Sequence, residues 1–182
     1  MWEDVLGHEQ QKAFLQQYLQ AEERPHALMF VGAVGLGKKK LALEFAKSLL
    51  CSTHTSTDFC EACRLMNLKD GNLSHPDFLL IKREYDEEKK RLKDISIEQI
   101  RALIAKSAFA PVMSDTKVCI IEDFDTSSEA AANCFLKLLE EPPAGWVLIL
   151  IVTDLEKILP TILSRVVTLR FNGVSENLMV SE

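Results

Sequence analysis

Short apolar runs alternate with amphipathic segments along most of the chain, and this alternation predicts the fold. The five runs expected to form strands are residues 27–31, 77–81, 118–121, 146–152 and 166–171. Segments whose apolar residues recur at helical spacing separate them. Strands that alternate with helices are typical of a parallel sheet covered by helices. We therefore expect an α/β domain built on a five-stranded parallel sheet.

The expected helices also show start and stop signals. They cover residues 8–19, 39–50, 126–139 and 155–164, and one further helix begins at Ser96. Ser96 with Gln99 forms a capping-box pattern, and Thr126 with Glu129 forms the same pattern. Pro160 is expected to interrupt the last helix. The mixed-charge run 82–91 has no periodicity, so it is expected to be a solvated loop.

A glycine-rich loop lies between the first strand and the helix that follows it. Residues 32–39, GAVGLGKK, match the phosphate-binding pattern G-x-x-x-x-G-K-[ST] except at the last position. In that pattern, backbone N–H groups and the lysine surround nucleotide phosphates, and the final hydroxyl binds Mg²⁺. Lys39 stands at that final position, and an ammonium has no lone pair for a metal. We expect a site for ATP or another nucleotide with impaired hydrolysis, formed by Gly32, Gly35, Leu36, Gly37, Lys38 and Lys39.

Two acids, Glu122 and Asp123, follow the apolar run 118–121. In phosphoryl-transfer ATPases, an acid at this place orients Mg²⁺ or its waters, and a following glutamate polarises the attacking water. Here the order of the two acids is reversed, which displaces each carboxylate on the ~1 Å scale that matters for catalysis. The alternative interpretation is two solvated acids at a strand end.

Three cysteines form a cluster in the sequence. Cys51, Cys60 and Cys63 have the spacing C-x8-C-x2-C. Structural zinc requires four ligands, and Met66 is a poor zinc ligand. Three other residues are candidates for the missing ligand: His54, Asp58 and His75. Two interpretations stay open, an incomplete zinc site or a metal-free remnant of one.

Composition narrows the class of protein. The chain has 182 residues, of which 47% are apolar, and a formal net charge of −6. This size and composition suit one globular domain with an ample core. The negative charge argues against a general nucleic-acid binder, which usually carries a basic face. No apolar run reaches the ~18 residues needed to cross a bilayer, and the N-terminus lacks a secretory pattern. We expect a cytoplasmic protein with no membrane partner.

Together these motifs closely resemble one family, the bacterial DNA polymerase III clamp-loader subunits of the AAA+ class. The resemblance covers nearly the whole chain, and its most specific parts are LLEEPP at 138–143 and the pair Ser164-Arg165. It also includes residues 2–9, 26–30, the cysteine module, 75–77 and 153–154.

The resemblance implies an AAA+ (RecA-like) phosphate-loop domain over residues 1–172, with the cysteine module 51–66 inserted. Residues 173–182 would begin a linker to a lid domain that the sequence lacks. In this family, gamma/tau subunits hydrolyse ATP, whereas the delta-prime subunit typically has a decayed loop and acts as a stator. Lys39 and the reversed acids favour the delta-prime-like role. Both kinds of subunit keep the serine-arginine pair, so the resemblance implies that Arg165 is a finger for a neighbour's ATP site. Thr153 would stand at the sensor position.

The expected function is therefore in DNA replication, by assembly rather than by intrinsic ATP hydrolysis. The implied partners are gamma/tau and delta subunits, the sliding clamp, and primed DNA reached through the complex. The alternative function is an active gamma/tau-type ATPase in which water or Glu122 holds Mg²⁺. A third hypothesis is a zinc-dependent contact of the cysteine segment with nucleic acid. Taken alone, Arg165 is also consistent with a surface ion-pair residue.

Overall fold

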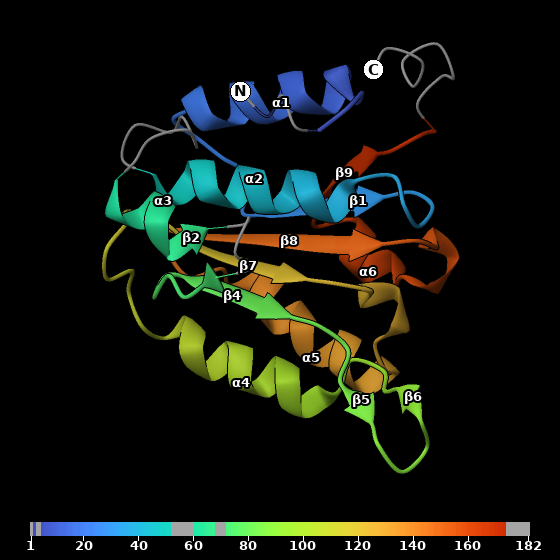
Figure 1. Cartoon of the computed structure of the whole chain (residues 1–182). Helices are drawn as coiled ribbons and strands as arrows, with labels where there is room; N and C mark the ends of the chain where they lie inside the picture. Colours follow the sequence, from blue (N-terminus) through green and yellow to red (C-terminus); the bar gives the residue numbers. More distant parts are fainter. Residues whose placement is uncertain (1, 3–4, 52–59, 68–71, 174–182) are drawn as a thin grey trace.

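A five-stranded parallel sheet forms the centre of the structure, with helices on both of its faces (Figure 1). The computed structural model describes residues 2, 5–51, 60–67 and 72–173. The sheet order is β4-β7-β8-β1-β9. These strands are β1 (Ala27–Val31), β4 (Phe78–Ile81), β7 (Lys117–Ile121), β8 (Trp146–Val152) and β9 (Val167–Arg170). The five expected strands are confirmed.

The helices lie in two layers, one on each side of the sheet (Figure 1). One layer contains α1 (Glu9–Gln20) and α2 (Lys38–Leu50), and the other contains α4 (Ile97–Ser107), α5 (Glu129–Glu140) and α6 (Pro160–Leu163). Two 3₁₀ turns, η1 (Phe124–Thr126) and η2 (Leu155–Lys157), follow β7 and β8. The remaining elements are α3 (Glu61–Leu65), a hairpin of β2 (Met66–Asn67) with β3 (Asn72–Leu73), and a hairpin of β5 (Tyr85–Asp86) with β6 (Arg91–Leu92).

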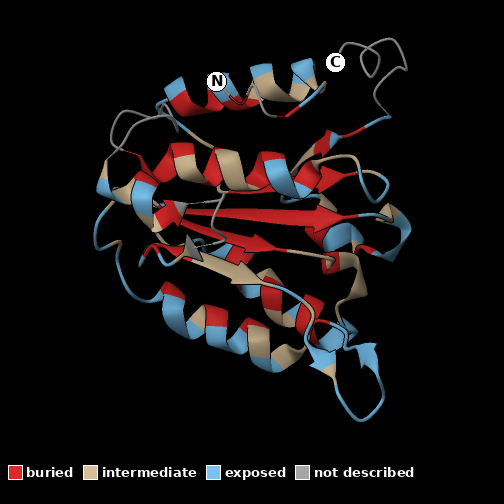
Figure 2. Ribbon diagram, in the orientation of Figure 1, coloured by how far each residue is buried: buried red, intermediate tan, exposed pale blue. Residues whose placement is uncertain are grey.

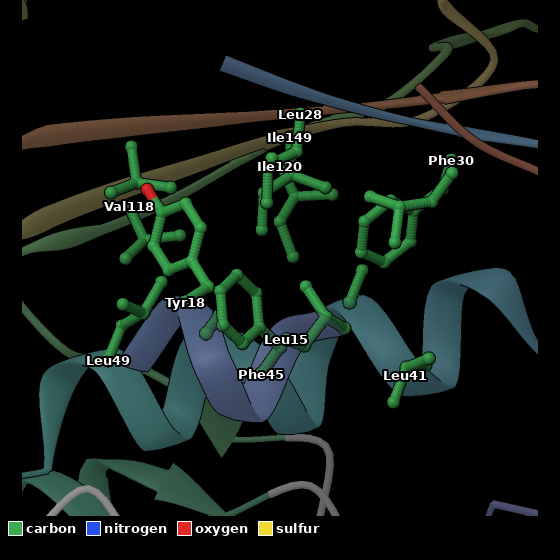
Figure 3. Packing of buried hydrophobic residues seen from close by; sticks show 14 of the residues in the cluster. Leu15, Tyr18, Leu28, Phe30, Leu41, Phe45, Leu49, Val118, Ile120 and Ile149 are labelled. Atoms are coloured by element: carbon green, nitrogen blue, oxygen red, sulfur yellow. The ribbon is translucent and has the colours of Figure 1, made fainter. Parts of the chain in front are cut away.

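The hydrophobic core has two halves, because alternate residues of each strand point to opposite faces of the sheet. Every residue of β1, β7 and β8 is buried (Figure 2). On β1, Leu28 and Phe30 pack against the layer of α1 and α2, as Figure 3 shows. The alternate residue Met29 packs against the opposite layer. Because each large apolar side chain contributes about 1.5–3 kcal/mol when fully buried, the central strands are the stable platform from which the loops project.

One local prediction was wrong, and two others held only in part. The N-cap of α5 is Ser128, whose side chain accepts the N–H of Ala131. Thr126 instead belongs to η1 and donates its hydroxyl to the carbonyl of Asp123, 2.8 Å away. The expected interruption at Pro160 is present, since η2 ends at Lys157 and Pro160 itself begins α6. The first helical position needs no N–H donor and suits the fixed φ of proline.

The mixed-charge run 82–91 is mostly exposed, as expected, but it forms most of the β5–β6 hairpin instead of a plain loop. Arg83 holds the base of this hairpin by donating to the carbonyls of Lys93 at 2.9 Å and Leu92 at 3.0 Å. Charge alone did not reveal these contacts, because they use backbone acceptors.

A buried carboxylate fixes the chain just before β7. Asp77 accepts N–H groups from Val112 and Met113, both at 2.7 Å, and from Ser114 at 3.0 Å. Burial acts to raise the pKa of Asp77, but these hydrogen bonds and the nearby His75 outweigh it and hold the pKa below its ordinary value. An ionised Asp77 thereby joins β4 to the loop that leads into β7.

Within the described ranges, none of the helices combines the length and the apolar character required to span a membrane.

Candidate functional site

The glycine loop joins the carboxyl end of β1 to the first turn of α2, as the sequence predicts. Gly32 closely approaches the end of β9, since an added Cβ would overlap the carbonyl oxygen of Phe171. Gly37 is the N-cap of α2 with φ 79°, a left-handed conformation that favours glycine. His8 also supports the loop, because its Nε2 lies 2.7 Å from the carbonyl of Leu36. The loop is therefore held from α1, β9 and α2.

Lys38 is folded into the loop. Its ammonium donates to the carbonyls of Gly32 at 2.5 Å and Ala33 at 2.6 Å, and the residue is 93% buried, with 7% exposed. Burial lowers the pKa of Lys38, and the carboxylates of Asp125 and Asp123 oppose that shift. A cation thus lies where the loop curves around the start of a 13-residue helix, an arrangement that favours anions.

Lys39 and Glu122, the two departures from the hydrolytic pattern, contact each other. Lys39 Nζ lies 2.9 Å from Glu122 Oε1, and the two side chains are 54% and 16% exposed. The contact is an ion pair rather than a well-directed hydrogen bond, since Glu122 Oε1 accepts no hydrogen bond within the described part of the chain. Glu122 is therefore not a freely solvated acid, and the set of ligands expected for Mg²⁺ does not fit that metal. One member has no lone pair, and it neutralises the other.

Asp125 connects the end of β7 to the end of β8, and the sequence reasoning missed it. Its Oδ2 accepts the N–H groups of Thr153 at 3.2 Å and Asp154 at 3.1 Å. Asp123 stands at the N-cap of η1 with φ 52°. The sequence feature that could have identified Asp125 is its place as a third acid, two residues beyond Asp123 and soon after a buried strand. Thr153, the expected sensor, is thus positioned through its backbone beside the acidic cluster.

Arg165 lies near the end of the sheet where the strands begin, whereas the glycine loop lies at the end where they finish. It precedes Val167, which pairs with Leu28 near the start of β1, whereas the loop follows Val31 at the end of β1. Arg165 Nη2 lies 3.1 Å from Glu140 Oε1, with the side chains 37% and 51% exposed. The geometry therefore separates Arg165 from the glycine loop of its own chain.

The three cysteines of the cluster come together. The sulfur atoms of Cys51, Cys60 and Cys63 lie within 4.8 Å of one another, so they fit three of the four ligands of a zinc site. Burial, followed by contacts with Cys60 and Cys51, raises the pKa of Cys63. Without a metal, this thiol therefore stays neutral at physiological pH.

Of the three candidates for a fourth zinc ligand, the described residues include only His75, and it does not join the cysteine cluster. His75 is engaged elsewhere, because its Nδ1 accepts the N–H of Asp77 at 3.1 Å and its Nε2 lies 3.5 Å from Ser114 Oγ. Burial lowers the pKa of His75, although Asp77 opposes this shift. His54 and Asp58 lie outside the described residues, as do positions 174–182 of the expected linker.

Comparison with known proteins identifies subunits of DNA polymerase III as relatives of this chain. The family model described as "DNA polymerase III, delta subunit" matches residues 7–175. The chain is 33% identical over 145 residues to DNA polymerase III subunit delta' of Pseudomonas aeruginosa, with 80% of this chain and 42% of that protein covered. It is 34% identical over 154 residues to subunit delta' of Bacillus subtilis, with 84% and 44% covered. Subunit tau of Bacillus subtilis is 33% identical over 183 residues, with 98% and 30% covered. The chain spans less than half the length of each of these relatives.

Solved structures agree on the fold. A DNA polymerase III gamma subunit-related protein from Thermotoga maritima has a TM-score of 0.62 at 24% identity, with 90% of this chain and 47% of that chain covered. The RuvB Holliday junction branch migration motor of Thermotoga maritima has a TM-score of 0.60 at 14% identity, with 98% and 49% covered. The expected AAA+ fold is thereby confirmed.

Proposed function

The chain belongs to the family described as DNA polymerase III, delta subunit, and on that basis we propose that it is a delta-prime-like clamp-loader subunit that serves a neighbour's ATP site. In this role it assembles with gamma/tau-type ATPase subunits and with delta. The sliding clamp and primed DNA are then reached through the whole complex.

The placement of Arg165 carries this proposal. An arginine toward the edge where the strands begin is remote from the glycine loop of its own chain, which lies where they end. It is suited to a nucleotide held by an adjacent subunit. A guanidinium placed against the charge that develops on a γ-phosphate accelerates hydrolysis by roughly 10³–10⁵ where such fingers operate.

Glu140 holds this arginine until assembly. The two side chains are 37% and 51% exposed, and ion pairs at the surface contribute about 0–1 kcal/mol. Arg165 can therefore leave Glu140 at little cost when a phosphate is offered to it. The same exposure keeps the guanidinium at the surface, where a neighbouring subunit can reach it.

The chain's own loop has a different role in this proposal, which is to bind a nucleotide without splitting it. Lys38 and the start of α2 offer positive charge to a polyphosphate. Lys39 and Glu122 occupy the places of the metal ligands with an ion pair. Thr153 stands beside this site as the sensor-position residue, and Asp123 lies at the turn that follows Glu122.

The test is an ATPase assay of Arg165→Ala in the subunit assembled with the ATPase subunits of its clamp loader. We expect the rate at the neighbouring site to fall by about 10³ or more, with assembly intact by size-exclusion chromatography. Arg165→Lys keeps the charge but lacks the planar fork, so it should recover little of the rate. Arg101→Ala removes an exposed arginine of α4 and serves as the matched control. An Arg165→Ala complex that assembles and hydrolyses ATP at the normal rate would refute the finger role.

A further inference from the structure

The Lys39–Glu122 pair places a protein cation at the position that a divalent metal takes in hydrolytic relatives of this fold. In such sites the residue after the loop lysine and the acid at the strand end hold Mg²⁺ between them. Here Lys39 supplies an ammonium from the second position of α2, and Glu122 supplies its carboxylate from the end of β7. The distance of 2.9 Å between Nζ and Oε1 leaves no room for an ion between these two atoms.

Several charged groups surround the glycine loop. Lys38 and Lys39 are the first two of three lysines that open α2, whose N-terminus adds positive potential. Glu122 is turned to Lys39, and Asp125 uses its Oδ2 to bind the N–H groups that follow β8. Asp123 and Asp125 also act electrostatically on Lys38. Two ammonium groups thus lie at the glycine loop, each within reach of acids that follow β7.

We infer that this loop binds a nucleoside triphosphate in its metal-free form, with the Lys39 ammonium, anchored by Glu122, neutralising the phosphate charge that Mg²⁺ neutralises elsewhere. The inference rests on the proposal that the loop binds nucleotide, and it specifies the form of the ligand. Metal-free ATP carries more negative charge than its Mg²⁺ complex, so it is attracted more strongly to two ammonium groups. The Mg²⁺ complex brings a dication against Lys39.

The exposure of the two side chains supports this division of roles. Glu122 is only 16% exposed and lies at the end of a fully buried strand, so it is a fixed anchor. Lys39 is 54% exposed, and its flexible stem lets the ammonium contact a phosphate while it stays near the carboxylate. A lysine of this kind acts as a tethered counter-ion.

The test is calorimetric titration of the purified protein with ATP, in EDTA and in excess Mg²⁺. We expect the wild-type protein to bind ATP in EDTA at least as tightly as in Mg²⁺. In Lys39→Thr, which replaces the ammonium by a hydroxyl suited to a metal, we expect affinity in EDTA to be about tenfold weaker than in Mg²⁺. Lys40→Thr removes the same charge one position along α2 and should retain the wild-type pattern.

Three outcomes would overturn the inference. They are wild-type binding that requires Mg²⁺, a Lys39→Thr variant with the same metal dependence as Lys40→Thr, and the absence of ATP binding under every condition. Circular dichroism of each variant shows whether it is folded. The Arg165 assay reports on a neighbour's site, so failure here leaves that result standing and is distinguishable from failure of the proposed function.

Discussion

At the scale of single residues, the most informative contact is the ion pair between Lys39 and Glu122. Because its Lys39 side chain is 54% exposed, water screens the pair, and screened surface pairs contribute about 0–1 kcal/mol to stability. Under the proposal that the loop binds a nucleotide, the importance of this pair is chemical rather than structural, because it decides which cation faces the phosphates. Each residue on its own was recognisable in the sequence as a departure from the hydrolytic pattern. Their contact was not recognisable, because the two residues are 83 positions apart and are brought together only by the packing of α2 and β7 in the folded sheet.

Other residues of the site show the same limit of sequence reasoning. Asp125 could be seen as an acid after a buried strand, but its hydrogen bonds to the N–H groups of Thr153 and Asp154 depend on how β7 lies beside β8. His75 was a reasonable zinc ligand by residue type. The structure turns its ring to Asp77 instead, which no spacing rule reveals.

The Asp77 carboxylate yields a stability prediction. Asp77→Asn keeps the shape but loses the charge that three N–H groups share, so we expect a loss of about 1–3 kcal/mol at pH 7. Urea denaturation measures it. Asp115→Asn, at an exposed acid of the same loop, should change stability by less than about 0.5 kcal/mol.

The same carboxylate predicts a dependence on pH. Because its pKa is lowered in the folded state, the stabilisation is present above the ordinary aspartate pKa of about 3.9 and is lost as pH falls through the lower folded value. The gap between wild type and Asp77→Asn should therefore narrow below about pH 4. A gap that stays constant down to pH 2.5 would mean that ionised Asp77 is not the source of the stabilisation.

At the scale of elements, the predictable parts were those with long, regular patterns. The fully apolar strand β8 and the capping box of α4 were confirmed, with Ser96 and Gln99 making both expected contacts. The errors fell on short turns. The position of η1 moved the cap of α5 from Thr126 to Ser128, and backbone contacts of Arg83 built a hairpin from a charged run. Such elements depend on local hydrogen bonds that hydrophobic periodicity does not report.

The cysteine module is the element whose metal state can be measured directly. Three sulfur atoms within 4.8 Å fit a zinc ion that takes its fourth ligand from elsewhere. We expect purified protein dialysed against zinc to retain about one equivalent by mass spectrometry. Cys60→Ser should lose that metal, whereas Cys134→Ser, in α5 and outside the cluster, should keep it. Equal zinc content in the wild type and Cys60→Ser would instead support a metal-free remnant.

At the scale of the whole molecule, the sheet separates the two proposed sites. The edge where the strands end carries the glycine loop, Lys39 and the acids, and the opposite side carries Arg165. One subunit in a ring can therefore offer its finger to one neighbour while its own loop serves a different purpose. Under the proposed function, this arrangement would let a chain with an impaired loop contribute to ATP hydrolysis in the complex. The motifs predicted both sites, and only the register of β9 against β1 placed them on opposite sides.

The central claim is that this chain does not hydrolyse ATP at its own loop. The most direct test is the rate at which the purified protein, without other subunits, hydrolyses Mg²⁺-ATP. We expect no turnover above that of Lys38→Ala, since Lys39 neutralises the acid that would orient the metal. Sustained turnover on the order of 1 s⁻¹, abolished by Lys38→Ala, would contradict it and identify the chain as an active ATPase of the gamma/tau type.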